Sequence, residues 1–194
     1  MQNALLFLLQ TFFSLYLLTF ALRLLLQWAA VDRRNPLVQF ILRVTNPLVI
    51  PLRRVLPPIG RVDTATLVAL AGLQVIATTV LVRIGCVGEP AFVEIVGLAL
   101  LGIAKLALGI LTWSIIIYVV LSWVSPGGYN PAAALVAAVV EPILAPFRRL
   151  IPPIGGLDLS PLIALIAIQA LSFLLPADQL LAGMLCRFPG GSVF

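Results

Sequence analysis

The chain has 194 residues, 62% of them hydrophobic and 10% charged, with a mean hydropathy of +1.17, which leaves too little polar surface for a water-soluble domain and predicts a membrane protein. It contains no histidine, which excludes imidazole metal ligands and imidazole acid–base catalysis, and no other set of catalytic groups converges, so neither an enzyme nor a metal or cofactor is predicted. The net charge of +5 does not indicate a nucleic-acid partner, because the arginines lie between apolar runs, where they meet lipid phosphates.

The first predicted membrane crossing is the uncharged run 4–22. At about 1.5 Å per residue, a run of this length can cross a hydrocarbon core of roughly 30 Å. A cleaved signal peptide is the alternative, but no basic side chain precedes the run and no convincing cleavage region follows it. Arg23 and Trp28 are expected to mark the exit into the headgroup region.

The next segment, 35–60, is apolar but too interrupted to cross a membrane. Asn35 and Pro36 predict a helix start, with asparagine as the N-cap and proline at the first helical position. Asn46 and Pro47 repeat this pattern. Two short interfacial helices are therefore expected here.

An arginine pair and a proline pair close this segment. Pro57 and Pro58 stop any longer helix. Arg53 and Arg54 would each cost about 2.5 to 3.5 kcal/mol at the bilayer centre. The segment is therefore expected to lie at the membrane surface, with a shallow re-entrant hairpin as the alternative if protein covers its free backbone groups.

The rest of the chain continues the same alternation of apolar runs and interrupted segments. Three further crossings are predicted at 64–82, 95–123 and 160–182, with a second interfacial segment at 130–155. Asp63 or Thr64 is expected to cap the first of these crossings. Pro176 is expected to bend or end the last.

An internal repeat organises the whole chain. The sequence PLRRVLPPIG at 51–60 returns as PFRRLIPPIG at 146–155, 95 residues later, and the offset holds without a gap between 28–74 and 123–169, where 17 of 47 positions are identical. This is the pattern of a tandem duplication, with repeats at 1–90 and 91–194. The predicted fold is an all-α membrane protein with four transmembrane helices, arranged as two parallel two-helix repeats that each carry an interfacial amphipathic segment.

The distribution of arginine predicts the orientation. Eight of the ten loop arginines between Arg33 and Arg187 lie in the connections that hold the two interfacial segments. Basic residues accumulate in cytoplasmic connections. Both arginine–proline turns are therefore expected to face the cytoplasm, with both termini on the periplasmic side.

The repeated motif resembles that of the YggT (YlmG) family of multi-pass membrane proteins, over nearly the whole chain. The motif positions that match are Asn35, Pro36, Pro57, Pro58, Gly60 and Asp63, with the second-copy partners Asn130, Pro131, Pro152, Pro153, Gly155 and Asp158. The resemblance implies a protein of the bacterial inner membrane or the thylakoid, associated with osmotic-stress tolerance, cell division or the assembly of membrane complexes. It brings no catalytic residues.

The arginine pairs are the candidate binding residues. They are Arg53 and Arg54 in the first repeat and Arg148 and Arg149 in the second. The simplest interpretation is that they anchor the chain to lipid phosphates and fix its topology. The alternative is a site for a specific anionic lipid or a protein partner.

Asp63 and Asp158 occupy equivalent positions just before the second crossing of each repeat. They are expected to cap helices or to pair with the arginines of the preceding turn. Ligation of an ion is the alternative.

Four polar residues are predicted to lie within the crossings. They form two equivalent pairs, Gln10 with Lys105 and Gln74 with Gln169. Interhelical hydrogen bonding is the favoured role of the second pair, with a permeation path as the alternative. Lys105 lies close enough to the membrane edge for its ammonium group to reach water.

The two cysteines, Cys86 and Cys186, are predicted to lie just beyond the outer ends of the second and fourth crossings. Two free thiols are favoured, because the cysteines do not obey the repeat offset. A disulfide between them is the alternative, since both would face an oxidising compartment.

Two functions from different classes follow from these observations. The favoured one is a non-enzymatic scaffold or assembly factor that binds anionic lipid, a protein partner or further copies of itself at the duplicated arginine–proline turns. The alternative is a component of an ion channel or transporter with a polar path at the repeat interface. The scaffold is favoured because Lys105 is the single charged residue inside the crossings as far as Pro176, and no selectivity filter or acidic ring is present.

Overall fold

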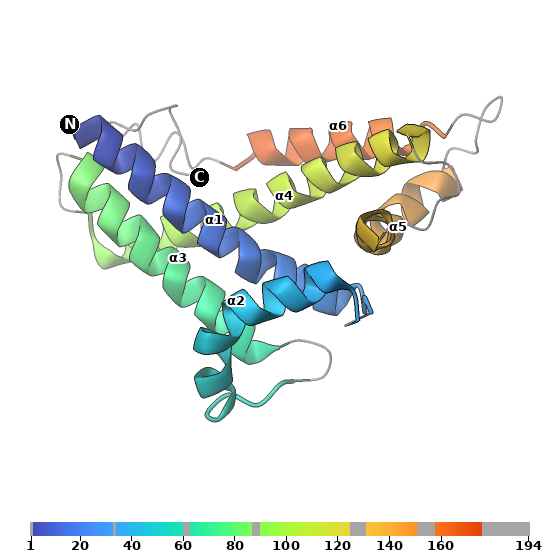
Figure 1. Ribbon diagram of the computed structural model, residues 1–194. Coiled ribbons are helices and arrows are strands. Elements are labelled where there is room, and N and C mark those ends of the chain that lie inside the picture. Colours follow the sequence, from blue (N-terminus) through green and yellow to red (C-terminus); the bar gives the residue numbers. More distant parts are fainter. Residues whose placement is uncertain are drawn as a thin grey trace.

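The computed structural model describes residues 2–32, 34–59, 63–86, 90–124, 131–150 and 158–175. In these ranges the chain forms six α-helices (Figure 1). The helices are α1 (Gln2–Trp28), α2 (Pro36–Arg53), α3 (Thr64–Gly85), α4 (Phe92–Val124), α5 (Pro131–Leu150) and α6 (Ser160–Phe173). The all-helical prediction is therefore confirmed for the described residues.

Three of the helices are long and apolar enough to cross a membrane, namely α1, α3 and α4, with 27, 22 and 33 residues. The predicted fourth crossing, 160–182, is not confirmed. Its described helix, α6, has 14 residues and spans only about 21 Å at 1.5 Å per residue. Proline removes a helical hydrogen bond and disfavours helical geometry in the residue before it, so the end of α6 at Phe173 agrees with the break expected from Pro176.

The first interfacial segment contains one helix where two were predicted. The N-cap prediction at Asn35 is confirmed, since its side-chain oxygen accepts a hydrogen bond from the Leu37 backbone N–H at 2.9 Å. The predicted second start at Asn46–Pro47 is wrong, because α2 runs through Pro47 and Pro51. The Asn46 side chain binds another helix, so it is not available as a cap. Figure 1 shows the bend that α2 makes before its end, as expected where proline removes a helical hydrogen bond.

The second interfacial segment behaves in the same way. Glu141–Pro142 stands there in place of Asn46–Pro47, and α5 continues through Pro142 and Pro146. Packing explains why these prolines do not end the helices: α2 lies against α1 and α3, and α5 lies against α4 and α6. Burial of an apolar helix face against two neighbours outweighs the loss of a few backbone hydrogen bonds.

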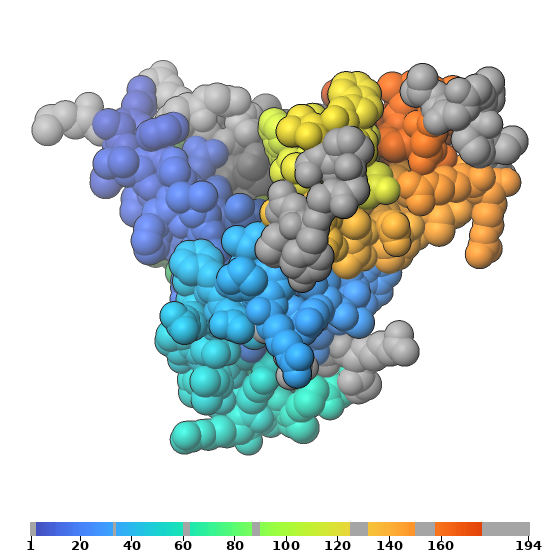
Figure 2. All heavy atoms as spheres, turned by 45° about the vertical axis from the view of Figure 1, so that its right-hand side comes forward, coloured from blue at the N-terminus to red at the C-terminus, as the bar shows by residue number. Residues whose placement is uncertain are grey.

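The two halves of the chain pack their helices alike. The contacts α1 with α3, α1 with α2, and α2 with α3 recur as α4 with α6, α4 with α5, and α5 with α6. The halves meet through α3 and α4, and through α5 against α1 and α2. Figure 2 shows one face of this arrangement, with α2 in light blue between α1 and the orange α5.

Equivalent positions also contribute to two of the interior clusters. Phe20, Val49 and Ala69 belong to the cluster among α1, α2 and α3. The residues 95 positions later, Ile115, Leu144 and Ala164, belong to the cluster among α4, α5 and α6. Each half therefore buries its own small core at the same three places, which is what a duplicated unit would produce.

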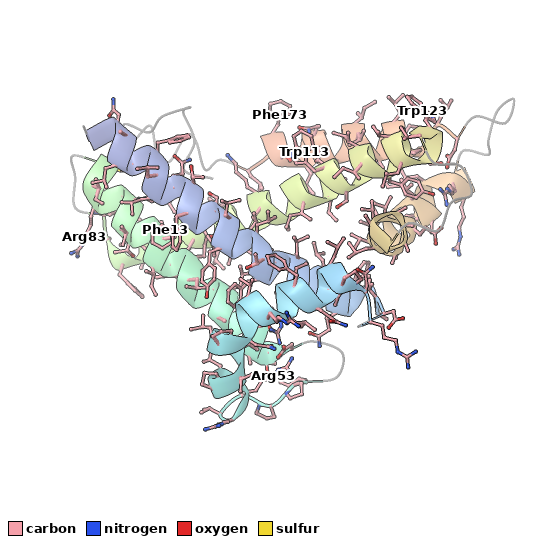
Figure 3. All side chains as sticks on the ribbon, viewed as in Figure 1. Phe13, Arg53, Arg83, Trp113, Trp123 and Phe173 are labelled. Carbon is pink, nitrogen blue, oxygen red and sulfur yellow. The ribbon has the colours of Figure 1, made fainter. Side chains whose placement is uncertain are left out.

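Large apolar side chains also cover the outside of the long helices. Phe12 on α1 and Trp113 and Trp123 on α4 are mostly exposed, and Figure 3 shows the two tryptophans on α4. Helices that are apolar on all sides are typical of a membrane interior. The exposed apolar surface of α1, α3 and α4 is compatible with a membrane protein.

Candidate functional site

A buried carboxylate lies where α1, α2 and α3 meet. Asp63, the residue before α3, has no exposed surface. Its carboxylate receives two hydrogen bonds from Arg53, the last residue of α2, through Nε at 3.2 Å and through Nη2. The Thr66 hydroxyl donates a third at 2.6 Å. The carboxylate thus ties the end of α2 to the start of α3.

A second arginine approaches the same carboxylate from α1. Arg23 is only 3% exposed, and its Nη2 lies 3.8 Å from Oδ2 of Asp63. Its Nη1 donates hydrogen bonds to Thr45 Oγ1 at 2.6 Å and to Asn46 Oδ1 at 2.9 Å. We call Arg23, Arg53 and Asp63 the arginine–aspartate cluster. It connects three helices and carries a net charge of +1.

The electrostatics of this cluster favour the ionised carboxylate. Burial by itself would raise the pKa of Asp63, because it penalises a charged form. Hydrogen bonds from Arg53 and Thr66 and the positive charges of Arg53 and Arg23 outweigh burial, so the pKa of Asp63 lies below its ordinary value of 3.8. Asp63 is therefore ionised at neutral pH.

The prediction that aspartates pair with the preceding arginines holds in both halves. In the second half, Arg148 Nε donates to Asp158 Oδ2 at 2.9 Å, and Arg148 Nη2 donates to the Tyr118 hydroxyl at 3.3 Å. The capping interpretation holds only for Asp158, whose Oδ1 accepts from the Ser160 backbone N–H at 2.9 Å. Asp63 occupies the N-cap position of α3, but its side chain makes no capping hydrogen bond.

The two halves differ in how deeply the aspartate of this pair is buried. Asp63 has no exposed surface and Asp158 is 37% exposed, whereas the arginines are similar, with Arg53 45% and Arg148 37% exposed. Tyr118 lies at the position equivalent to Arg23, so a neutral phenol replaces the second arginine. The buried cluster with two cations is therefore specific to the first half.

The two arginines within each pair have different environments. Arg53 and Arg148 are bound to aspartate, as described above. Arg54 and Arg149, one residue later, are exposed. The first arginine of each pair thus ties the end of its helix to the aspartate ten residues later, and the second is exposed.

A cavity of about 700 Å³ opens between the end of α1 and α2. Its polar lining includes Arg23, Gln27, Asn46 and Arg53. Figure 3 shows Arg53 at the end of α2. Two of the three cluster residues thus reach a space large enough for a small molecule.

Sequence reasoning misjudged Arg23. It was expected only to mark the membrane exit of the first helix, yet its side chain points into the protein and binds Asp63 and α2. Thr45 and Thr66, which complete its surroundings, were not singled out at all. The available signal was the pairing of Arg23 with a tyrosine at the repeat offset, which indicated a role other than contact with lipid phosphates.

Of the two equivalent pairs of predicted intramembrane polar residues, Gln74 and Gln169 differ in burial. Gln74 is 1% exposed, and its Nε2 has no hydrogen-bond partner among the described residues. Gln169, its partner in the repeat, is exposed on α6. Gln10 and Lys105 are partly buried, and each has an interaction partner.

Some of the remaining motif positions lie within the described residues, and the others lie outside them. Pro57 and Pro58 are exposed after α2, and Pro131 begins α5. The other motif positions lie outside the described residues, namely Gly60, Asn130, Pro152, Pro153 and Gly155.

The favoured prediction for the cysteines is wrong at Cys86. This residue, which follows α3, is disulfide-bonded and carries no free thiol. Cys186, the other cysteine of the sequence, lies outside the described residues.

Comparison with known proteins gives one family. The family model for CCB3/YggT matches residues 2–84 and 97–179, and both ends of the second range lie 95 residues after those of the first. This equals the offset between the two arginine–proline motifs.

Several curated relatives are similar over most of their length. An uncharacterized protein of Pseudomonas aeruginosa is 41% identical over 90% of this chain and 89% of its own. An uncharacterized protein from the proC 3' region of Vibrio alginolyticus is 41% identical over 90% of this chain and 94% of its own. The uncharacterized protein YggT of Escherichia coli K12 is 36% identical over 88% of each chain. No solved structure matches the chain.

Proposed function

Because the chain belongs to the CCB3/YggT family, we propose that it is a non-enzymatic scaffold or assembly factor, integral to the cell inner membrane. It acts by binding anionic lipid or a partner protein, which includes a second copy of itself, at the two arginine–proline turns. Its role belongs to osmotic-stress tolerance, cell division or the assembly of a membrane complex. The turns face the cytoplasm, and both termini are periplasmic.

This proposal rests on one observation: in both halves, the first arginine of the pair binds an aspartate, and the second binds none among the described residues. In each half, an aspartate binds the first arginine and so fixes the backbone at the end of an amphipathic helix. The second arginine, Arg54 or Arg149, is exposed one residue later. A cation held in this way is available to a partner without the entropy cost of ordering the turn on binding.

The surroundings of these cations suit a membrane surface. Both α2 and α5 carry apolar residues on one face and arginines at their ends. Such helices lie in the interface, with the apolar face in the lipid and the charged residues at the headgroups. Each cation near an anionic surface contributes about 1 kcal/mol of attraction.

Removing the two exposed cations tests the scaffold proposal. Arg54→Gln with Arg149→Gln is expected to weaken association by about 2 kcal/mol, or roughly 30-fold, because two contributions of about 1 kcal/mol are lost. The measurement is the amount of anionic lipid and of each protein that co-purifies with the full chain in native nanodiscs.

Arg83→Gln provides the control. Arg83 is an exposed arginine at the opposite end of α3 from Asp63, so its loss should leave co-purification unchanged. The transport alternative predicts another outcome: ion flux in proteoliposomes that changes on Lys105→Gln, with co-purification intact in the double arginine variant, would refute the scaffold proposal.

The orientation has its own test. Val55, which is 79% exposed, follows the first arginine pair. In a background where both cysteines are serine, Val55→Cys should react with a membrane-impermeant thiol reagent in inside-out vesicles and not in intact spheroplasts, because the turn faces the cytoplasm. Labelling from the outside of spheroplasts would contradict the proposed topology.

A further inference from the structure

The cavity between α1 and α2 has the features of a site for an anionic molecule with an apolar part. Its polar wall contains Arg23 and Arg53, and the described residues that line it include no aspartate or glutamate. Its other wall is apolar and includes Trp28, which is exposed, and Val31 and Leu42, which are partly exposed. The volume of about 700 Å³ lies within the range of small-molecule sites.

The charges beside this cavity are mainly positive in the part of the chain that the structure describes. There Arg23 and Arg53 lie beside one carboxylate, that of Asp63, which has no exposed surface. Arg23 is itself almost completely buried. Two cations near one carboxylate attract an anion, and this attraction is strong in a medium of low dielectric constant.

Hydrogen bonds within the protein also fix the side chains of Arg23 and Arg53 in position. Thr45 and Asn46 accept hydrogen bonds from Nη1 of Arg23, and Asp63 holds Arg53. A guanidinium group presents a planar fork of donors that matches the oxygens of a phosphate group. The orientation of Arg23 is therefore fixed before any ligand enters.

We propose that this cavity binds one anionic phospholipid, with the phosphate at Arg23 and Arg53 and an acyl chain along the apolar wall. Arg23 lies near the end of α1, a helix long enough to cross the membrane, and lipid phosphates lie at the depth where such helices end. Basic pockets between transmembrane helices are known to hold anionic headgroups. A free phosphate ion would leave the apolar wall uncovered, which favours a lipid.

The second half lacks this site. Tyr118 stands in place of Arg23, and Glu141 stands in place of Asn46. A carboxylate in that position repels a phosphate group. One lipid site per chain is therefore expected, although the arginine–proline turn occurs twice.

This site deepens the proposed function and rests on it in taking an anionic lipid as the ligand, but it uses Arg23 and Arg53 and not Arg54 or Arg149. The test is native mass spectrometry of the detergent-purified full chain, titrated with phosphatidylglycerol or with phosphatidylcholine. One phosphatidylglycerol is expected to bind at least tenfold more tightly than phosphatidylcholine. Arg23→Gln should weaken phosphatidylglycerol binding at least tenfold, because a hydrogen bond between charged groups contributes about 1.5 to 3 kcal/mol.

Three further variants keep the test independent of folding and of the scaffold proposal. Leu42→Trp fills the cavity without touching the ion cluster, and it should also weaken phosphatidylglycerol binding. Tyr118→Phe, which removes a hydroxyl from the second half, should leave it unchanged. Arg54→Gln with Arg149→Gln should retain the bound lipid, so loss of partner association in that variant bears only on the scaffold.

Three results would overturn the lipid site. They are equal binding of phosphatidylcholine, unchanged phosphatidylglycerol binding in both Arg23→Gln and Leu42→Trp, and displacement of the lipid by an equal concentration of inorganic phosphate. The last result would assign the arginines to a free anion.

Discussion

Asp63→Asn is expected to destabilise the folded protein by about 3 to 5 kcal/mol. The substitution removes the only carboxylate that binds Arg23 and Arg53 among the described residues, and breaking a buried ion pair leaves an uncompensated charge in the interior. The contacts from α1 and α2 to the start of α3 would be lost together. Thermal unfolding of the detergent-purified chain measures the effect.

Asp158→Asn is the matched control from the second half. Asp158 and Arg148 are each 37% exposed, and an exposed ion pair contributes only about 0 to 1 kcal/mol. The structure therefore predicts a much larger loss from Asp63→Asn than from Asp158→Asn. Equal losses would mean that burial does not distinguish the two pairs.

The same aspartate predicts a pH dependence of stability. Because the pKa of Asp63 is lower in the folded protein than its ordinary value of 3.8, its carboxylate stabilises the fold above that value. This contribution is lost as the pH falls through the lower, folded pKa. The difference in stability between the native chain and Asp63→Asn should therefore be constant near neutral pH and shrink in acid below about pH 4.

Gln74→Met is expected to have the opposite effect and to stabilise the protein by about 1 to 3 kcal/mol. Gln74 is 1% exposed, and its Nε2 has no hydrogen-bond partner in the part of the chain that the structure describes. A buried polar group without a partner costs about this much, and methionine fills a similar volume without that cost. Thermal unfolding in detergent measures the gain.

Gln169→Met is the control for this prediction. Gln169 has the equivalent position in the repeat but is exposed on α6, so its replacement should change stability little. A loss of stability in Gln74→Met would show that the amide makes a hydrogen bond that matters to the fold. A gain would indicate that Gln74 is retained for a reason other than stability.

Much of the local structure follows from the sequence by itself. The uncharged runs predict the three long helices, because only a helix pairs all its backbone polar groups in an apolar medium. The pattern at Asn35 and Pro36 predicts the start of α2, since the side-chain cap and the fixed proline φ act within a few residues. Each aspartate also pairs with the arginine ten residues before it, as expected.

Other features depend on contacts between segments far apart in the chain. α2 continues through Pro47, because its packing on α1 and α3 outweighs the helix-breaking preference of proline. Arg23 turns inward because α2 and the start of α3 bring Thr45, Asn46 and Asp63 to it. Gln74 and Gln169 match in the repeat yet differ in burial, because α3 also packs on α4 of the other half. Two repeats with similar sequences thus form different sites, because the helices of each half pack against different helices of the other half.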